Sequence, residues 1–458
     1  MFNKSIGKLT GKTSHIASHF ESVTLNSIRN TLPDHAITEA CIAAGHRYRI
    51  RRITPVLTVL HMIAAAIWPE DSFAASWQLI WSTFVAAFPH VYACSPSRGD
   101  VANARKRLPR QVWSNLFAWL SQQAQTASAS VACWRSHRVI HVDGTCLTLC
   151  DKPDVREAFG VLRGKSGDRR YPMAKLVCVS LAETMTVIAY RLGCYRDDEN
   201  ALLNPLLASL QKGDLLVADR HYAGANLYWK YMQHGLEYVT RMHQHLIVSR
   251  LKRLWTYSEN DFVAKMKIGD AYRRRDPSLP ASLAVRFICV QARVRGHHKC
   301  LWFATSLLDA GRYPAAEVAR LYLQRWRIET LLRQFKVDCG ADVLRSHTVD
   351  GIHKEAAARL CAINIVRMIM LEAAVKNDVD PLRISFVHAM RTILAFAPLL
   401  AVRPICQLPA IYRAMLVEIA AGLVPERPGR LEPRSITHDR GYPKLKTTRA
   451  QWRQQHAA

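Results

Sequence analysis

Three acidic residues far apart in the sequence, Asp143, Asp219 and Glu329, have the chemistry to bind divalent metal ions together. Mg²⁺ prefers hard oxygen ligands and keeps several waters, so a few carboxylates that converge from different elements suffice to hold it. Two such ions roughly 4 Å apart support phosphodiester cleavage, because one activates the attacking oxygen and the other stabilises the leaving oxygen. The elements that carry the three acids decide whether they can converge.

The two aspartates lie on predicted strands. The run RVIHVDGTCLTLC is β-branched and apolar, with Asp143 near its middle and Gly144 next, where something can approach closely. Burying a carboxylate in a central strand is unfavourable without a cation. Asp219 follows Leu215, Leu216 and Val217, at the end of a short buried strand where sites in α/β sheets usually lie. The simpler alternatives are a turn at Asp143 and an ion pair between Asp219 and Arg220.

The third acid lies in residues 319–336, which lack Pro and Gly and predict one helix. At about 100° per residue, Tyr322, Arg325, Glu329 and Lys336 fall within roughly 60° of one another. An adjacent apolar stripe would seat this helix on a core; it consists of Leu321, Ile328, Leu332 and Phe335. The simpler alternative is an amphipathic helix in which Glu329 pairs with Arg325 or Arg333, worth about 0.2–0.5 kcal/mol.

The pattern Y-x2-R-x3-E-x6-K, together with VDGT around Asp143 and GDLLVADRHY around Asp219, resembles the DDE transposases of the insertion sequence 4 family. The resemblance covers roughly residues 45–450. It implies that Asp143, Asp219 and Glu329 form a catalytic triad that binds two divalent ions, Mg²⁺ or Mn²⁺.

The same resemblance assigns DNA contacts outside the triad. Tyr322, Arg325 and Lys336 would contact phosphates of the transposon end. Trp302 is the candidate for stacking on a flipped base, and Trp255 is the alternative; either residue can instead belong to the core. The segment DRHYAG departs from the family pattern. The resemblance therefore assigns no role to His221.

Composition is consistent with a nucleic-acid partner. The 458 residues include 63 Lys and Arg against 36 Asp and Glu, a formal charge of +27, which favours a polyanion such as double-stranded DNA. No run reaches the ~18 apolar residues of a membrane span, and no secretory signal is visible. Twelve cysteines without a CxxC pair indicate reduced thiols. We therefore expect a cytoplasmic, nucleoid-associated bacterial protein that acts as a homodimer on transposon ends and target DNA, as the family does.

The expected fold class is α/β, with an RNase H-like catalytic core interrupted by a β-rich insertion. We expect a helical N-terminal DNA-binding domain in residues 1–130, a core in residues 137–244 and 303–376, the insertion in residues 245–302, and a helical C-terminal region with a basic tail in residues 377–458. The tail is Pro-rich and predicts an extended arm that orders on DNA, with Tyr442 and Trp452 as aromatic anchors.

The favoured function is a cut-and-paste DNA transposase, which binds insertion-sequence ends and catalyses metal-dependent strand cleavage and strand transfer. One alternative is a decayed transposase that acts only as a sequence-specific DNA-binding protein. The intact triad favours the enzyme. A second alternative is an RNase H-like nuclease unrelated to transposition, and the pattern in residues 319–336 argues against it.

Overall fold

The computed structural model describes residues 25–48, 51–69, 72–89, 94–129, 133–162, 171–242, 251–294 and 297–425. The chain divides into two compact units, Met1–Gly422 and Leu423–Ala458. The helices and strands named below all belong to the first unit. The predicted basic arm, with Tyr442 and Trp452, lies outside the described residues.

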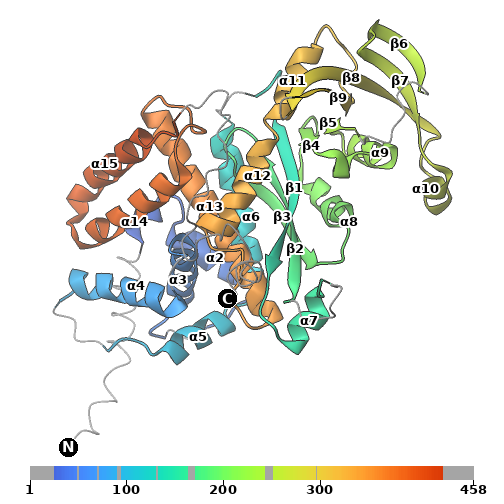
Figure 1. Ribbon diagram of the computed structural model, residues 1–458. Coiled ribbons are helices and arrows are strands. Elements are labelled where there is room, and N and C mark those ends of the chain that lie inside the picture. Colours follow the sequence, from blue (N-terminus) through green and yellow to red (C-terminus); the bar gives the residue numbers. More distant parts are fainter. Residues whose placement is uncertain are drawn as a thin grey trace, which may run out of the picture. The chain divides into compact units, whose positions relative to one another are not determined.

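A large mixed sheet is the centre of the first unit, so the class is mixed α/β, as predicted (Figure 1). Its nine strands have the order β3-β2-β1-β4-β5-β9-β8-β7-β6. Their bounds are β1 Val139–Thr148, β2 Met173–Leu181, β3 Val187–Cys194, β4 Leu215–Ala218, β5 Glu237–Arg241, β6 Lys252–Ser258, β7 Asp261–Lys267, β8 Ser282–Val294 and β9 His297–Thr305. Strand β4 runs parallel to both β1 and β5, and the other neighbours are antiparallel.

Helices from both ends of this unit share one hydrophobic core. They are α2 Asp34–Ala43, α3 Pro55–Ile67, α4 Phe73–Ala87, α5 Arg98–Arg107, α6 Arg110–Ser128, α13 Val349–Lys376, α14 Phe386–Val402 and α15 Leu408–Ala421. Thr54 caps the start of α3, because its side chain accepts a hydrogen bond from the Leu57 N–H. Helix α13 packs against α3, α6 and α15, so the N-terminal helices have no separate core. Across the described ranges, no helix is long and apolar enough to cross a membrane.

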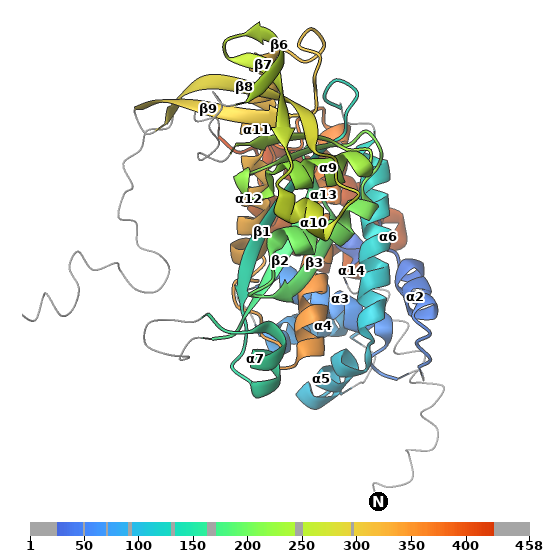
Figure 2. The same cartoon turned by 90° about the vertical axis from the view of Figure 1, so that its right-hand side faces the viewer.

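The β-rich insertion continues the main sheet. Strands β8 and β9 pair along their length (Figure 2). Strand β9 also pairs with β5, where Thr305 lies opposite Val239. Strands β6 to β8 lie within residues 245–302, whereas β9 extends past residue 302 into the expected core. The last strand, β6, is exposed along its length, and its pairing with β7 is interrupted by two register irregularities. The insertion is therefore joined to the main sheet by backbone hydrogen bonds between β5 and β9, as well as by its covalent connections.

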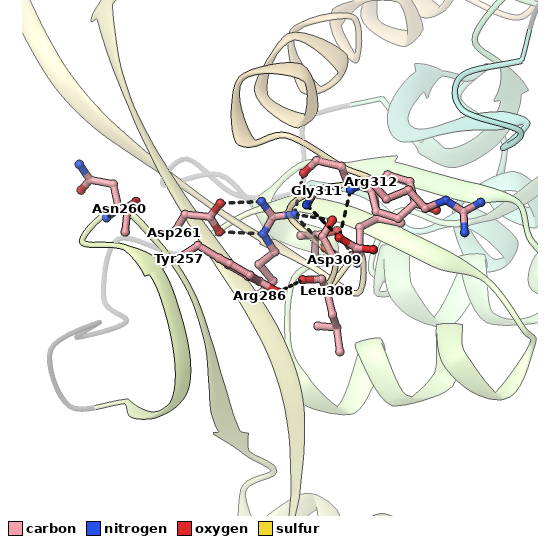
Figure 3. Close-up of polar contacts among 12 residues, drawn as sticks. Tyr257, Asn260, Asp261, Arg286, Leu308, Asp309, Gly311 and Arg312 are labelled. Carbon is pink, nitrogen blue, oxygen red and sulfur yellow. Dashed lines mark hydrogen bonds and ion pairs between the residues drawn. The ribbon is translucent and has the colours of Figure 1, made fainter.

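A buried arginine fastens this insertion to the segment that precedes α11 Ala315–Leu323 (Figure 3). Arg286 on β8 is fully buried and donates two hydrogen bonds to the Asp261 carboxylate, at 2.7 and 2.6 Å. Its remaining nitrogen donates to the carbonyl oxygens of Leu307, at 3.1 Å, and Tyr313, at 2.7 Å. The planar guanidinium can therefore donate to the Asp261 carboxylate and to the two backbone carbonyls at the same time. Arg286 thus holds β7, β8 and the approach to α11 in one arrangement.

The prediction of one continuous helix over residues 319–336 is wrong. The segment forms α11, then α12 Trp326–Arg333, and ends in a π-helical turn, Gln334–Asp338. Between α11 and α12, the N–H groups of Arg327 and Ile328 bond to carbonyls only three residues back. The two halves bury different residues: Leu321 joins a cluster on the sheet with Phe303, whereas Ile328 joins the helical core. We attribute the break to this change of packing partner.

Residues 197–211 also contain a helix that changes type. Residues 197–211 form α8 Glu199–Leu203, capped by Asp198, and continue as a 3-10 helix, Asn204–Ser209. Pro205 explains the change, because proline has no N–H to donate and its ring crowds the preceding turn. This leaves Glu199 in a one-turn helix beside the ends of β1 and β4. Three further α-helices of the described residues are α7 Pro153–Phe159, α9 Ala225–Gln233 and α10 Asp270–Arg275.

Candidate active site

Asp143 lies on β1 just beyond the point where its neighbour β4 ends. The β1–β4 pairing stops at His141 and Val217, so the edge of β1 is open on that side at Asp143. The carboxylate is half-buried and accepts a hydrogen bond from the Gly144 N–H at 2.8 Å. Burial raises its pKa to about 6, the Gly144 N–H and Arg325 oppose the shift, and the negative charges of Asp219 and Glu329 add to it. Asp143 is thus a carboxylate whose buried surroundings disfavour its charge.

Asp219 directly follows β4, as the sequence predicted. Its carboxylate accepts a hydrogen bond from the His221 N–H at 2.7 Å and so caps the short 3-10 turn Arg220–Tyr222. The alternative ion pair with Arg220 is absent among the described residues, and Arg220 is exposed. Since β1 and β4 are parallel neighbours, Asp219 and Asp143 lie at the same end of the sheet.

Glu329 lies on α12 and is linked to Asp143 by Arg325, which contacts both carboxylates. The Arg325 guanidinium contacts the Glu329 carboxylate at 2.5 Å and the Asp143 carboxylate at 3.6 Å. The simple helical ion pair anticipated for Glu329 is therefore present, but the same arginine also contacts the sheet. Side-chain exposure is 16% for Arg325 and 49% for Glu329, so the cation is the better buried partner. One guanidinium thus links two of the three acids.

The other predicted contact residues have different surroundings. Tyr322 is buried against Phe303, with ring centroids 4.7 Å apart, and burial raises its pKa. Lys336 lies in the π-helical turn and forms an ion pair at 2.9 Å with Asp342, which follows that turn. Trp302 is half-buried against Phe262, whereas Trp255 on β6 is 44% exposed. Tyr322, Arg325, Glu329 and Lys336 therefore do not form one continuous exposed stripe, because the helix is broken and bent into two packing environments.

Two residues beside the triad were not singled out from the sequence. A Cβ built on Gly144 would lie 2.6 Å from the Glu199 carboxylate, which identifies the close approach predicted at that glycine. The hydroxyl of the fully buried Tyr222 donates a hydrogen bond to Glu199 at 2.9 Å. Burial and the charges of Glu199, Asp143 and Asp219 raise the pKa of Tyr222, so it stays a neutral donor. An acid in the first turn of a helix is ordinary in a sequence, so only Gly144 gave a signal.

The donors fit a divalent ion in kind, since Asp143, Asp219 and Glu329 all offer carboxylate oxygens. In the described part of the chain, no three His, Cys, Asp or Glu side chains are close enough to hold one ion together. Instead the Arg325 guanidinium contacts both Asp143 and Glu329. The space at Gly144 is taken by a carboxylate. The arrangement is a group of acids beside the point where β4 ends, with Arg325 as the cation on the α12 side.

Comparison with known proteins identifies the family of this chain. Residues 134–365 match the family model described as "Transposase DDE domain", and this range contains Asp143, Asp219 and Glu329. The chain belongs to that family of transposases. It is similar to "Transposase InsG for insertion sequence element IS4" from Escherichia coli (strain K12), with 24% identity over 278 residues, 60% of this chain. The match spans 61% of that relative's length, and it confirms the resemblance to the insertion sequence 4 family.

A solved structure also matches: "Cryo-EM structure of piggyBac transposase synaptic complex with hairpin DNA (SNHP)". The TM-score is 0.46 at 12% sequence identity, over 89% of this chain and 86% of that one.

Proposed function

We propose that this chain is a DNA transposase that binds insertion-sequence ends and catalyses metal-dependent strand cleavage and strand transfer through Asp143, Asp219 and Glu329. The observation that supports the proposal is that Arg325 contacts both Asp143 and Glu329, while the parallel register of β1 and β4 brings Asp219 level with Asp143. The electrostatic effect of Asp219 and Glu329 on Asp143 supports it, because such coupling requires proximity. Strands β1 to β5, with β4 parallel to β1 and β5, would be an RNase H-like core.

Each residue has a role that follows from its chemistry. Asp143, Asp219 and Glu329 would hold two divalent ions, Mg²⁺ or Mn²⁺. When bound, these ions supply activation of water or a 3′-hydroxyl and stabilisation of the leaving oxygen. Arg325 suits bidentate phosphate binding, and Lys336 supplies a point charge. Binding of DNA and ions would require Arg325 to give up its present carboxylate partners.

The remaining assignments concern DNA and assembly. Tyr322 is buried beside Arg325, so it would orient that arginine and reach DNA only at its hydroxyl. For base stacking, the exposure of Trp255 makes it a better candidate than half-buried Trp302. The chain would act as a homodimer on paired transposon ends. The five predicted domains, from the helical residues 1–130 to the C-terminal residues 377–458, remain part of this proposal.

The test is excision from a supercoiled plasmid in which the element's own ends flank a marker. Wild type with Mg²⁺ is expected to excise the marker, and Glu329→Ala is expected to lose excision while keeping end binding. Glu157→Ala is the matched control, because Glu157 is an exposed acid on α7. Binding without excision by wild type would instead favour a decayed, DNA-binding copy. Excision by Glu329→Ala at the wild-type level would refute the triad.

A further inference from the structure

Three lysines of the insertion lie side by side near one end of the nine-stranded sheet (Figure 2). Lys265 and Lys267 alternate with one residue between them on β7, so their side chains point to the same face. Lys252 on β6 is paired directly opposite Lys265. All three residues are exposed. Their neighbours on β8 are small, because Ala284 lies opposite Lys265 and Ser282 lies opposite Lys267.

These lysines lie on the same face of the sheet as Asp143. Residues directly opposite each other in paired strands share a face, and so do alternate residues of one strand. Ala284, opposite Lys265, therefore shares its face with Ile288 on β8. Ile288 packs beneath α11 in the same cluster as Val139 of β1, and alternation along β1 places Asp143 on the face of Val139. The lysines thus continue the face of the candidate active site toward β6.

The charges of this group have no acidic partner in the described parts of the chain. None of the three lysines belongs to an ion pair there. Asp261, the acid on the same face of β7, is bonded to Arg286. Side chains directly opposite each other have Cβ atoms about 4.5–5.5 Å apart, so Lys252 and Lys265 repel each other. An anion bound between them would remove this repulsion.

Protection of the sheet edge does not explain the whole group. A lysine on a terminal strand resists aggregation, and this accounts for Lys252 on β6. Strand β7 is paired on both sides, with β6 and β8, so Lys265 and Lys267 do not lie on an edge. A row of lysines across two strands instead suits a long anion with evenly spaced charges. Duplex DNA has one negative charge per about 1.7 Å of its axis.

We propose that Lys252, Lys265 and Lys267 bind the phosphate backbone of duplex DNA, whatever its base sequence, on the face that carries Asp143. The proposal rests on the proposed function, since it assigns a further stretch of the DNA substrate to that face. The lysine ammonium is a point charge on a flexible stem, so it holds phosphates and positions the duplex. These contacts are separate from those proposed for Arg325 and Lys336.

The test measures fluorescence anisotropy of a labelled duplex whose sequence is unrelated to the element's ends. The full chain is titrated without divalent metal, so that no strand is cleaved, at a series of salt concentrations. The triple variant Lys252→Gln, Lys265→Gln, Lys267→Gln is expected to reduce the slope of log K against log salt by about two to three. Its Kd at low salt is expected to weaken at least about tenfold.

A matched control removes three charges from the other side of the same insertion. Ile268 and Leu279 flank α10 and pack into the cluster of Phe262, whose side chain lies on the face opposite Lys265. The control variant on α10 is Arg273→Gln, Arg274→Gln, Arg275→Gln, at three exposed positions. Its slope and Kd are expected to stay close to wild type. Equal losses in both triple variants would show an effect of net charge alone and would overturn the proposal.

The single variant Lys265→Gln separates binding from folding. It removes the repulsion with Lys252, so the free protein is expected to unfold at a higher temperature while its salt slope falls by about one. A lower unfolding temperature with an unchanged slope would show that Lys265 has only a structural role. Lysine-dependent binding of single-stranded RNA, with no such dependence for the duplex, would also overturn the proposal.

The outcomes distinguish this surface from the proposed function. A wild-type salt slope in the triple lysine variant, with normal excision by the wild-type chain, would overturn the lysine surface and leave the triad intact. A reduced slope in that variant, with no excision by the wild-type chain, would support the surface and count against the proposed function.

Discussion

Arg325 of α12 lies 3.6 Å from Asp143 of β1, measured from guanidinium Nη1 to carboxylate Oδ2. The same guanidinium contacts Glu329, one turn further along α12. A side chain of the helix thus occupies the position of positive charge between two acids that the proposed function assigns to metal ions. Arg325 and a divalent ion should therefore compete for these carboxylates.

This competition can be measured with Arg325→Gln. Removal of the cation leaves the negative charges of Asp143 and Glu329 uncompensated, so Mn²⁺ should bind DNA-free protein about threefold more tightly, or better. Strand cleavage should fall, because the same arginine is proposed to hold phosphate. Arg333→Gln is the control, since Arg333 lies on the same helix but pairs with Asp338. Weaker Mn²⁺ binding in Arg325→Gln would contradict the competition.

The ion pair between Lys336 and Asp342 gives a second prediction. Lys336→Met should lower affinity for an end duplex and reduce the slope of log K against log salt by about one, as for loss of one phosphate contact. Asp342→Asn should have the opposite effect on affinity, because it releases Lys336 from a partner 2.9 Å away. Filter binding at salt concentrations from about 50 to about 300 mM, a range that includes physiological salt, measures the affinity and the salt slope of each variant. An unchanged salt slope in Lys336→Met would exclude the contact.

Glu183, in the turn between β2 and β3, should make stability depend on pH. Burial raises its pKa to about 7 from an ordinary value of 4.5, while its own backbone N–H and Arg327 oppose the shift. Between these pH values the folded protein keeps a proton that the unfolded chain releases, so stability falls as pH rises. Glu183→Gln should match wild type below pH 4.5 and exceed it by up to about 3 kcal/mol above pH 7.

Urea unfolding at a series of pH values tests this slope. Glu157→Gln is the control, because the exposed Glu157 should give a curve parallel to wild type. A constant difference between Glu183→Gln and wild type over the whole range would show that Glu183 ionises normally.

The Arg286 network gives a prediction about the attachment of the insertion. Arg286→Met leaves the buried Asp261 charge without its partner, which should destabilise the protein by about 3–5 kcal/mol. The double variant Asp261→Asn, Arg286→Met should recover part of this loss, because no charge remains buried. Arg273→Met on exposed α10 should change stability by no more than about 0.5 kcal/mol. Denaturant unfolding compares the three, and equal losses for both arginine variants would contradict the account.

Sequence patterns were sufficient for the strands that carry the aspartates. Short β-branched runs around Asp143 and before Asp219 depend on local preference, and both strands form as predicted. The fold class follows from the alternation of these strands with helical segments, and the mixed α/β sheet agrees with it. The position of Gly144 also indicated a close approach, and Glu199 is the group that makes it.

Features that depend on contacts across the fold could not be predicted in this way. The break before α12 arises because Leu321 and Ile328 pack into different cores, and the residues at the break have ordinary helical propensity. The link from Arg325 to Asp143 joins residues 182 positions apart, and helical spacing alone suggested only the pair with Glu329. The continuity of the insertion with the main sheet depends on the pairing of Val239 with Thr305, which no local pattern encodes.

Strand β6 ends the nine-stranded sheet, and its sequence bears on solubility. A terminal strand offers backbone donors and acceptors to any other extended chain, and Leu254, Trp255 and Tyr257 make this one apolar as well. Two register irregularities along β6 interrupt the regular row of backbone groups, and Lys252 and Arg253 add charge at its start. Bulges and cations are the devices by which natural sheets resist edge-to-edge aggregation. The irregular pairing of β6 thus protects the sheet from adding strands of a second molecule.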